Sequence, residues 1–86
     1  MVMQGMIRVT IRLADTVADL VGHQALEYSL PQHTQLAGLF TMLYVKYPML
    51  ADKFSSLRVE LNGKTVNMHT ELVEDDEVTI NLQEDG

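Results

Sequence analysis

Hydrophobic residues alternate with polar ones in four stretches of the chain, which is the period of β-strands that bury one face. The first stretch covers residues 7–13, and the second covers residues 26–30, where Pro31 ends the run because proline lacks a backbone donor. The third stretch covers residues 57–61, and the last covers residues 78–82. We expect these strands to share one sheet, with their aliphatic side chains on the same face.

Between the second and third stretches, the hydrophobic period changes to that of an α-helix. From Leu36 to Tyr47, apolar residues recur at positions i, i+3, i+4, i+7, i+8 and i+11. Thr34 is placed to act as the N-cap, and Pro48 ends the helix because it biases the preceding residue away from helical angles. The sequence therefore predicts one main helix over residues 36–47.

Short local signals predict the turns between these elements. Gly22 closes a bend or a turn of helix after the first strand, because glycine adopts positive φ at little cost. The pair Asn62-Gly63 is typical of a tight type I′ hairpin turn, so we expect residues 64–68 to return as a short strand. The acidic run at residues 74–76 is expected to be a solvated turn before the last strand.

The order of elements is strand, strand, helix, strand, short strand, strand. The helix must cover one face of the sheet, because that face carries all the alternating aliphatic residues. The first and last strands are long and aliphatic enough to lie side by side in the centre. We therefore predict an α+β fold of the β-grasp (ubiquitin-like) type, with a four- to five-stranded mixed sheet packed on one main helix. The single domain is expected to span residues 1–86, with residues 1–5 disordered or derived from expression, and residues 83–86 forming a flexible C-terminal tail.

Composition narrows the classes of function. The 86 residues are 47% hydrophobic and 21% charged, which suits one folded domain. The absence of Cys excludes disulfides, thiolate metal sites, ferredoxin-type clusters and thiol catalysis. The net charge of -6 disfavours nucleic acid and anionic membranes and favours a basic partner surface, although solubility alone also accounts for such a charge. No apolar run reaches the length that spans a bilayer, and we expect a cytoplasmic protein.

Side chains that bind metal ions in other proteins are scattered here. His23, His33 and His69 are too widely spaced for a local ligand motif, and we expect them to be surface or loop residues. Metal binding by His23 with His33 requires the fold to bring them together. The carboxylates of residues 74–77 lack the alternate spacing and central glycine of a calcium loop. We therefore predict no bound metal or cofactor, and no independent catalytic site.

The order and spacing of these motifs resemble the family of ubiquitin-like sulfur carriers, which includes the small subunit of molybdopterin synthase (MoaD) and the thiamine sulfur carrier (ThiS). The resemblance runs along the whole chain and rests on Ile7-Arg8-Val9, Leu20-Val21-Gly22, Leu30-Pro31, Tyr47-Pro48, Leu57 to Lys64 and Leu72 to Val78. It implies that a partner enzyme, using ATP and a sulfur donor, adenylates and thiocarboxylates the C-terminal Gly86. The chain would then donate sulfur in molybdopterin or thiamine biosynthesis.

The resemblance also implies which proteins the chain meets. They are an adenylating enzyme of the MoeB or ThiF type and the large subunit of a molybdopterin synthase. At most, the chain is the carrier subunit of such a sulfur-transfer enzyme. The family uses the outer face of its sheet and its tail for these contacts, which corresponds here to Arg8, Arg12, Arg58, Thr79, Asn81, Gln83, Glu84 and Asp85. A merely solvated sheet face is the alternative. Met42 lies off the apolar stripe of the helix, so it is expected to be exposed and available to an interface.

The last residues depart from the family pattern. Family members end in two glycines, which a partner threads through a narrow channel, whereas this sequence ends in Asp85-Gly86. The Asp85 side chain adds bulk and negative charge beside the carboxylate that must react with anionic ATP. Three explanations are open: a carrier that tolerates Asp-Gly, a related protein without sulfur transfer that acts as an interaction subunit or ubiquitin-like modifier, or a chain that lacks its last residues.

Overall fold

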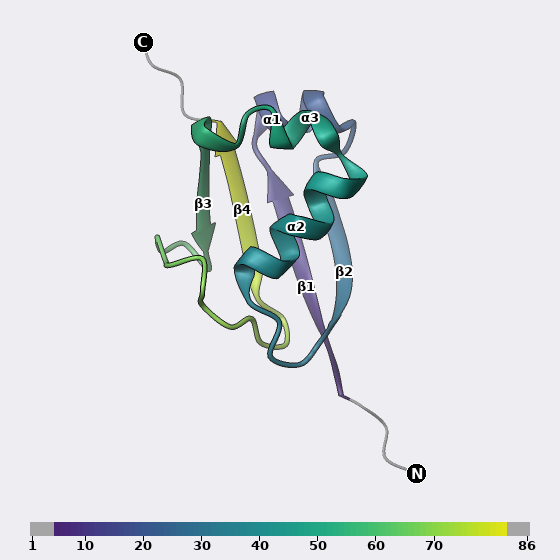
Figure 1. The fold of residues 1–86 in the computed structure, drawn as a ribbon, viewed down its shortest axis with the longest axis vertical. Helices are drawn as coiled ribbons and strands as arrows, with labels where there is room; N and C mark the ends of the chain where they lie inside the picture. The colour runs from purple at the N-terminus through teal and green to yellow at the C-terminus, as the bar shows by residue number, and fades with distance from the viewer. Residues whose placement is uncertain (1–4, 83–86) are drawn as a thin grey trace.

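Four strands form one mixed sheet, and the computed structural model describes residues 5–82 of the chain, apart from the side chain of Phe54 (Figure 1). The strands are β1 (Met6–Leu13), β2 (Ala25–Pro31), β3 (Leu57–Leu61) and β4 (Glu77–Leu82). They lie in the order β2-β1-β4-β3, in which β1 and β4 are parallel and the two outer pairs are antiparallel. The prediction that the first and last strands lie side by side in the centre of a β-grasp sheet is confirmed.

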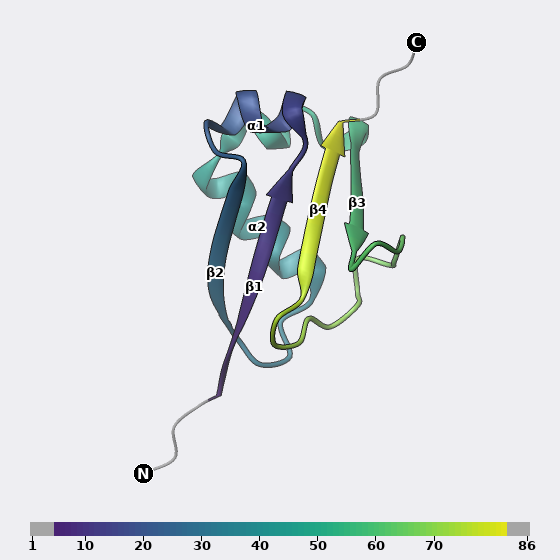
Figure 2. The ribbon, with the colours of Figure 1, turned by 180° about the vertical axis from the view of Figure 1, so that it is seen from behind.

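The helices lie on one face and at one end of this sheet. They are α1 (Asp15–Val21), α2 (Leu36–Lys46), α3 (Pro48–Ala51) and the short 3-10 helix η1 (Phe54–Ser56). α2 crosses the sheet diagonally (Figure 1), and the view from behind shows the strands with no helix in front of their central part (Figure 2). Gly22 ends α1 with φ of 87°, as its sequence position predicts. None of the helices in residues 5–82 is long and apolar enough to cross a membrane.

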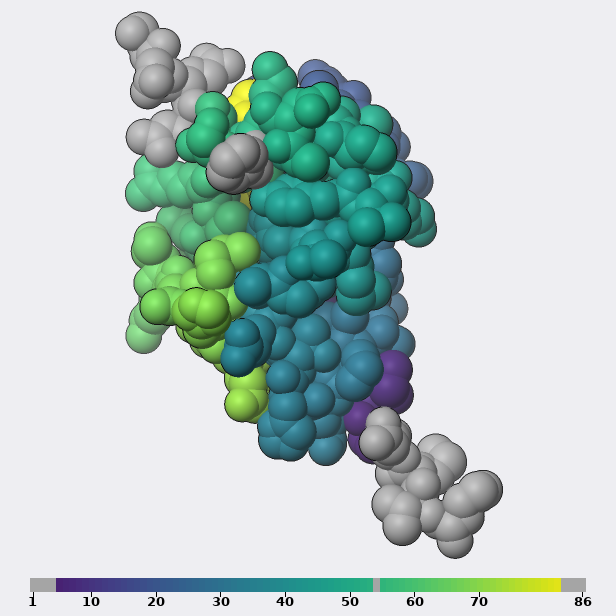
Figure 3. Space-filling model, viewed as in Figure 1, coloured from purple at the N-terminus to yellow at the C-terminus, as the bar shows by residue number. Residues whose placement is uncertain are grey.

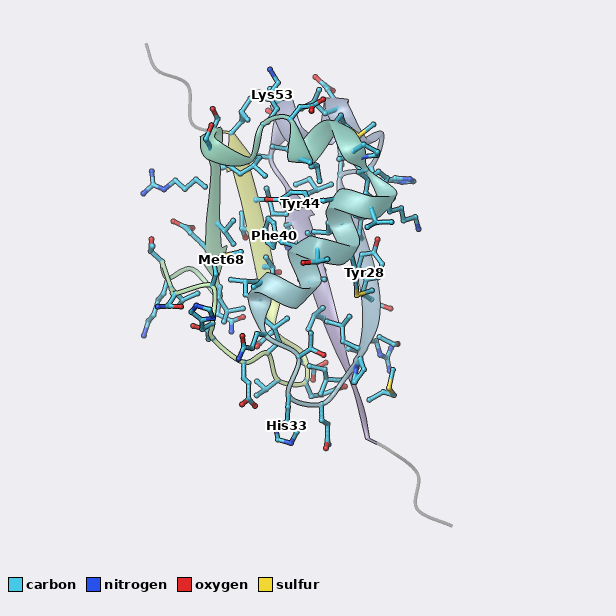
Figure 4. The ribbon with its side chains drawn as sticks, in the orientation of Figure 1. Tyr28, His33, Phe40, Tyr44, Lys53 and Met68 are labelled. Carbon is cyan, nitrogen blue, oxygen red and sulfur yellow. The ribbon has the colours of Figure 1, made fainter. Side chains whose placement is uncertain are left out.

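The core lies between α2 and the sheet. In β1 every second residue is buried, so the alternation in the sequence becomes two distinct faces. Phe40 and Tyr44 project from α2 towards the sheet, with their rings 5.8 Å apart in an edge-to-face arrangement (Figure 4). The most deeply buried side chains come from β1, β2, β4, the three α-helices and the loop before β4: Val9, Ile11, Val17, Leu30, Leu36, Leu39, Leu43, Leu50, Leu72, Val78 and Ile80.

The N-terminus of α2 differs from the prediction. Thr34 is not its N-cap, and no side chain caps this helix. Instead, the backbone N–H of Leu36 donates to the carbonyl of Thr70 at 3.0 Å, and that of Ala37 donates to Met68 at 2.8 Å. The loop before β4 therefore satisfies the helix donors that a cap residue normally satisfies, which makes a local cap unnecessary.

The return strand predicted over residues 64–68 does not form. The turn itself is present, since Asn62 and Gly63 both have positive φ, at 52° and 84°. Only Leu61 and Lys64 form a bridge across it. Beyond Lys64 the backbone leaves the sheet to reach the N-terminus of α2, so it cannot also pair with β3.

The acidic turn at residues 74–76 is not fully solvated as predicted. Asp75 is exposed with φ of 67°, but Asp76 is only 6% exposed. One oxygen of the Asp76 carboxylate accepts a hydrogen bond from the Asn62 side-chain amide, and the other accepts one from the Val73 N–H, both at 2.8 Å. This side chain therefore ties the turn after β3 to the loop before β4.

Candidate functional site

The tail leaves the fold from the end of a central strand. β4 is paired on both sides, and its last residue, Leu82, lies opposite Leu57 of β3. This end of β4 points to the end of the molecule where α1 and α3 lie, away from the beginning of β1 (Figure 1). The predicted site residues Gln83, Glu84, Asp85 and Gly86 lie outside the described residues. The residue that precedes them, Leu82, has a fixed position, because the sheet and the core hold the end of β4 in place.

The structure brings together most of the residues expected on the outer face of the sheet. Arg12 lies opposite Thr79 across the parallel pair, and Arg58 lies opposite Asn81 across the antiparallel pair. Because β1, β4 and β3 adjoin, these four residues are neighbours on one face of the sheet. Arg8 lies apart from the others, because it pairs with β2 and its position in β1 precedes the start of β4.

Carboxylates share this face, which the sequence analysis missed. Glu77 accepts a hydrogen bond from Arg12 Nε at 2.5 Å, and this bond, followed by the charge of Glu77, raises the pKa of Arg12. Arg8 lies 4.0 Å from Glu27, and both side chains are highly exposed. Glu60 is the third acidic residue on this face. These three glutamates alternate with more buried residues along their strands, so the sequence could have placed them on the outer face. The face therefore carries mixed charge and is not a basic patch.

The face of α2 that points away from the sheet carries exposed apolar side chains. Met42 is 43% exposed, so its predicted exposure is confirmed, and Val45 is 79% exposed. Met49 in α3 is also 38% exposed. The space-filling view shows that α2 and α3 form much of the surface on this side of the molecule (Figure 3). The sequence analysis did not single out Val45, because a valine at helical spacing is usually a core residue.

The histidines do not meet. His23 follows α1 and lines a shallow hollow with Asp15 and Asp19, whereas His33 follows the far end of β2. Figure 4 shows His33 at the end of the molecule opposite Lys53. Because β2 separates His23 from His33, the hypothesis of a metal site between them is wrong. Within residues 5–82, no group of three or more His, Cys, Asp and Glu residues could hold a metal ion.

His33 takes part in a second, separate hollow. Its Nδ1 lies 2.9 Å from Glu71 Oε1, and both side chains are exposed. The hollow of about 310 Å³ beside them has an apolar floor that includes Ile7 and Leu72. It lies at the end of the molecule opposite the exit of the tail, so it is not part of a site built around the tail.

The sheet order, the parallel pairing of the first and last strands, and the main helix α2 across one face define a β-grasp protein of the ubiquitin-like type. Solved structures confirm this class. A Pyrococcus furiosus protein provisionally described as molybdopterin converting factor, subunit 1, superposes with a TM-score of 0.81 and 18% identity over 90% of this chain and 98% of its own.

Archaeal modifier proteins are similar to the same extent. Small archaeal modifier protein 1 from Haloferax volcanii superposes with a TM-score of 0.81 and 14% identity, covering 92% of this chain and 98% of that one. The Methanosarcina acetivorans protein of the same name has a TM-score of 0.77 and 21% identity, covering 95% of this chain and 98% of its own. No protein-family model and no curated protein matches the chain. At these identities the likeness establishes the fold.

Proposed function

We propose that this chain is a ubiquitin-like carrier whose C-terminal carboxylate, on Gly86, is activated by a partner enzyme. The observation that carries the proposal is the exit of the tail from β4, a central strand whose end is held by Leu57 on the neighbouring strand. Four further residues of the sequence, ending in Gly86, follow Leu82. A fixed strand end from which the chain continues to Gly86 suits a protein that presents this residue to the active sites of others.

The proposed chemistry belongs to the carboxylate and to the partner. A carboxylate oxygen of Gly86 attacks the α-phosphorus of ATP, forms an acyl adenylate and releases pyrophosphate. Hydrosulfide, which the donor supplies, then attacks the carbonyl carbon, AMP leaves with the electrons of the broken carbon–oxygen bond, and the sulfur gives up its proton to solvent. The product is a thiocarboxylate, which donates its sulfur in the assembly of molybdopterin or thiamine. ATP and the sulfur donor are bound by the activating partner, of the MoeB or ThiF type.

Docking to these partners is assigned to the part of the outer sheet face nearest the tail. Arg12, Thr79, Arg58 and Asn81 are adjacent across the strands that lead to it. Their mixture of positive charge and amide and hydroxyl groups suits a polar interface with directed hydrogen bonds. The large subunit of a molybdopterin synthase is the partner proposed to receive the sulfur.

The similarity to small archaeal modifier protein 1 favours a second candidate function, attachment to other proteins as a ubiquitin-like modifier. The same adenylate is then attacked by a lysine amine instead of a sulfur donor, and an isopeptide bond forms. A third outcome, a non-catalytic interaction subunit, needs no activation and is favoured by Asp85 in place of a second glycine. These candidates differ in what becomes of the terminal carboxylate.

Intact-mass measurement separates the candidates. The protein is incubated with ATP, a sulfur donor and the adenylating enzyme of the same organism, and its mass is recorded over time. A carrier gains the difference between one sulfur and one oxygen atom, and a variant that lacks Gly86 gains nothing. Adducts with a lysine-bearing protein support the modifier. An unchanged mass, with an enzyme that thiocarboxylates another carrier, contradicts both and leaves the interaction subunit.

A matched variant tests the role of Asp85. Asp85→Gly restores the two glycines of the carrier pattern and removes one negative charge beside the reacting carboxylate. If Asp85 impedes threading and adenylation, this variant reacts faster than the wild-type protein under the same conditions. Equal rates would mean that the partner accepts Asp-Gly without penalty.

A further inference from the structure

The Asn62-Gly63 turn has a chemical reactivity that its role as a turn does not use. An asparagine side chain followed by glycine is open to attack by the glycine backbone nitrogen, because glycine has no side chain to shield that nitrogen. Both residues are exposed, and apart from chain neighbours no atom lies within 4 Å of the position that a Cβ on Gly63 would occupy. The Gly63 N–H also donates to no acceptor among residues 5–82. The attacking nitrogen is therefore accessible and not engaged elsewhere.

The side-chain amide that this nitrogen would attack is held by two hydrogen bonds. Asn62 Nδ2 donates to Asp76 Oδ1 at 2.8 Å, and Asn62 Oδ1 accepts from the Glu77 N–H at 2.9 Å. The amide must leave these partners and turn towards Gly63 before it can react, which slows the reaction by roughly tenfold for each bond. The folded protein should therefore react more slowly than the unfolded chain, but the exposed turn leaves the reaction open.

We propose that Asn62 is a modification site at which the chain converts its own asparagine to aspartate or isoaspartate. The Gly63 nitrogen gives up its proton to solvent and attacks the side-chain carbonyl carbon of Asn62. The new carbon–nitrogen bond closes a succinimide ring, the bond from that carbon to Nδ2 breaks, and Nδ2 takes a proton from solvent and leaves as ammonia. Water then adds to one of the two ring carbonyls and opens the ring. Water is the only co-reactant that this sequence of steps needs.

The modification reverses the sign of the contact with a buried carboxylate. Asp76 is only 6% exposed, and its Oδ1 receives a hydrogen bond from the Asn62 amide. A carboxylate at position 62 places an acceptor oxygen and a negative charge where the Nδ2 donor stood. Two carboxylates then face each other beside a buried site, where solvent and salt screen their repulsion less than at the surface. The turn after β3 would be pushed away from the loop before β4.

The contact that is lost supports other parts of the fold. Asp76 also accepts a hydrogen bond from the Val73 N–H at 2.8 Å, and in the same loop the carbonyl of Thr70 accepts an N–H of α2. The next residue along the chain, Glu77, forms the ion pair with Arg12 on the outer face of the sheet. The end of β3 and the start of β4 lie side by side in both ribbon views (Figures 1 and 2). Modification at position 62 would therefore loosen this end of the sheet over time, whichever of the proposed functions the chain has.

Storage of the folded protein at neutral pH and physiological temperature, followed by peptide mass mapping, tests the reactivity of the site. The peptide that contains Asn62 should gain the difference between a hydroxyl and an amino group, roughly tenfold to a hundredfold more slowly than in a sample unfolded in urea. Asn67 and Asn81, which larger residues follow, are internal controls and should stay unmodified. Gly63→Asn tolerates the positive φ of the turn but shields the attacking nitrogen, so it should suppress conversion at position 62.

Urea unfolding of designed variants tests the consequence for the fold. Asn62→Asp imitates the product and should raise the equilibrium constant for unfolding roughly tenfold. The double variant N62D/D76N exchanges the carboxylate and the amide, so a donor again faces an acceptor and the Val73 N–H keeps a carbonyl partner. Although each single change destabilises the protein, the double variant should recover most of the wild-type stability.

Two outcomes overturn the proposal. One is an Asn62 that is still unmodified in the folded protein after about a hundred half-times of the reaction in the unfolded sample, or that reacts no faster than Asn67 and Asn81. The other is a double variant no more stable than Asn62→Asp, which would mean that the facing carboxylates do not cause the loss.

Discussion

Asp76 offers a direct test of how the loops around the sheet are held. Its carboxylate is 6% exposed and accepts hydrogen bonds at 2.8 Å from the Asn62 amide and from the Val73 N–H. Asp76→Asn keeps the shape of the side chain but replaces one acceptor oxygen with a donor, so one of the two bonds becomes a contact between donors. Hydrogen bonds to charged groups contribute about 1.5–3 kcal/mol each. We expect the free energy of unfolding to fall by about 2 kcal/mol.

Urea unfolding followed by circular dichroism measures this loss. The midpoint should move to lower urea at an unchanged slope, because the variant unfolds from the same structure. Asp75→Asn is the matched control: it removes a neighbouring charge at an exposed residue, and asparagine tolerates the positive φ of this position. The control should unfold within about 0.5 kcal/mol of the wild-type protein. Equal midpoints for both variants would refute the assigned role of Asp76.

Four further predictions follow from the fold. Gly22→Ala should lower the free energy of unfolding, measured by thermal unfolding, by about 1 kcal/mol. The cause is backbone strain alone, because φ is 87° and no neighbouring atom obstructs a Cβ. Leu39→Ala should cost about 3 kcal/mol, whereas Val45→Ala, at a side chain 79% exposed, should leave the urea midpoint unchanged. Thr34→Ala should cost less than the roughly 1 kcal/mol expected for loss of an N-cap, because other carbonyls satisfy α2. Burial raises the pKa of Tyr44, so its contribution to stability is complete below the ordinary tyrosine pKa of about 10 and is lost as pH rises through the folded value; Tyr44→Phe should reduce this alkaline loss.

The strands and the tight turns could be predicted because their causes are local. Alternation over residues 7–13 translates directly into the buried and exposed faces of β1. Gly22 and the Asn62-Gly63 pair adopt positive φ because of their own chemistry, whatever surrounds them. The parallel contact of the first and last strands was inferred from their length and aliphatic content, and the central positions of both strands agree with that reasoning.

The features that could not be predicted depend on contacts between distant segments. The donors of α2 are satisfied by Met68 and Thr70, more than thirty residues away from the helix start in sequence. The same contacts explain why residues 64–68 form no strand. From the sequence alone, Asp76 is expected to be a surface carboxylate. It is buried because the fold brings Asn62 and the Val73 N–H within hydrogen-bonding distance of it. Local patterns carry no information about such pairings.

The candidate site was predictable in position but not in its electrostatics. The outer face and the exit of the tail follow from the strand order, which the sequence supplied. The pairing of Arg12 with Glu77 reduces the charge that a partner would meet, and it was overlooked because the residues predicted for the sheet face included none of its carboxylates. Residues 83–86 lie outside the described residues, so their proposed role rests on the position of the end of β4 and on the chemistry of the terminal carboxylate.

Exchange of labelled pyrophosphate into ATP, catalysed by the adenylating enzyme of the same organism, tests the central claim most directly. It reports formation of the acyl adenylate, the step that the sulfur-carrier and modifier functions share, and it needs no sulfur donor. We expect exchange that depends on this protein, increases with Asp85→Gly and disappears when Gly86 is deleted. Exchange that is absent, with an enzyme that is active on another carrier, or that is unaffected by deletion of Gly86, would contradict activation of this carboxylate.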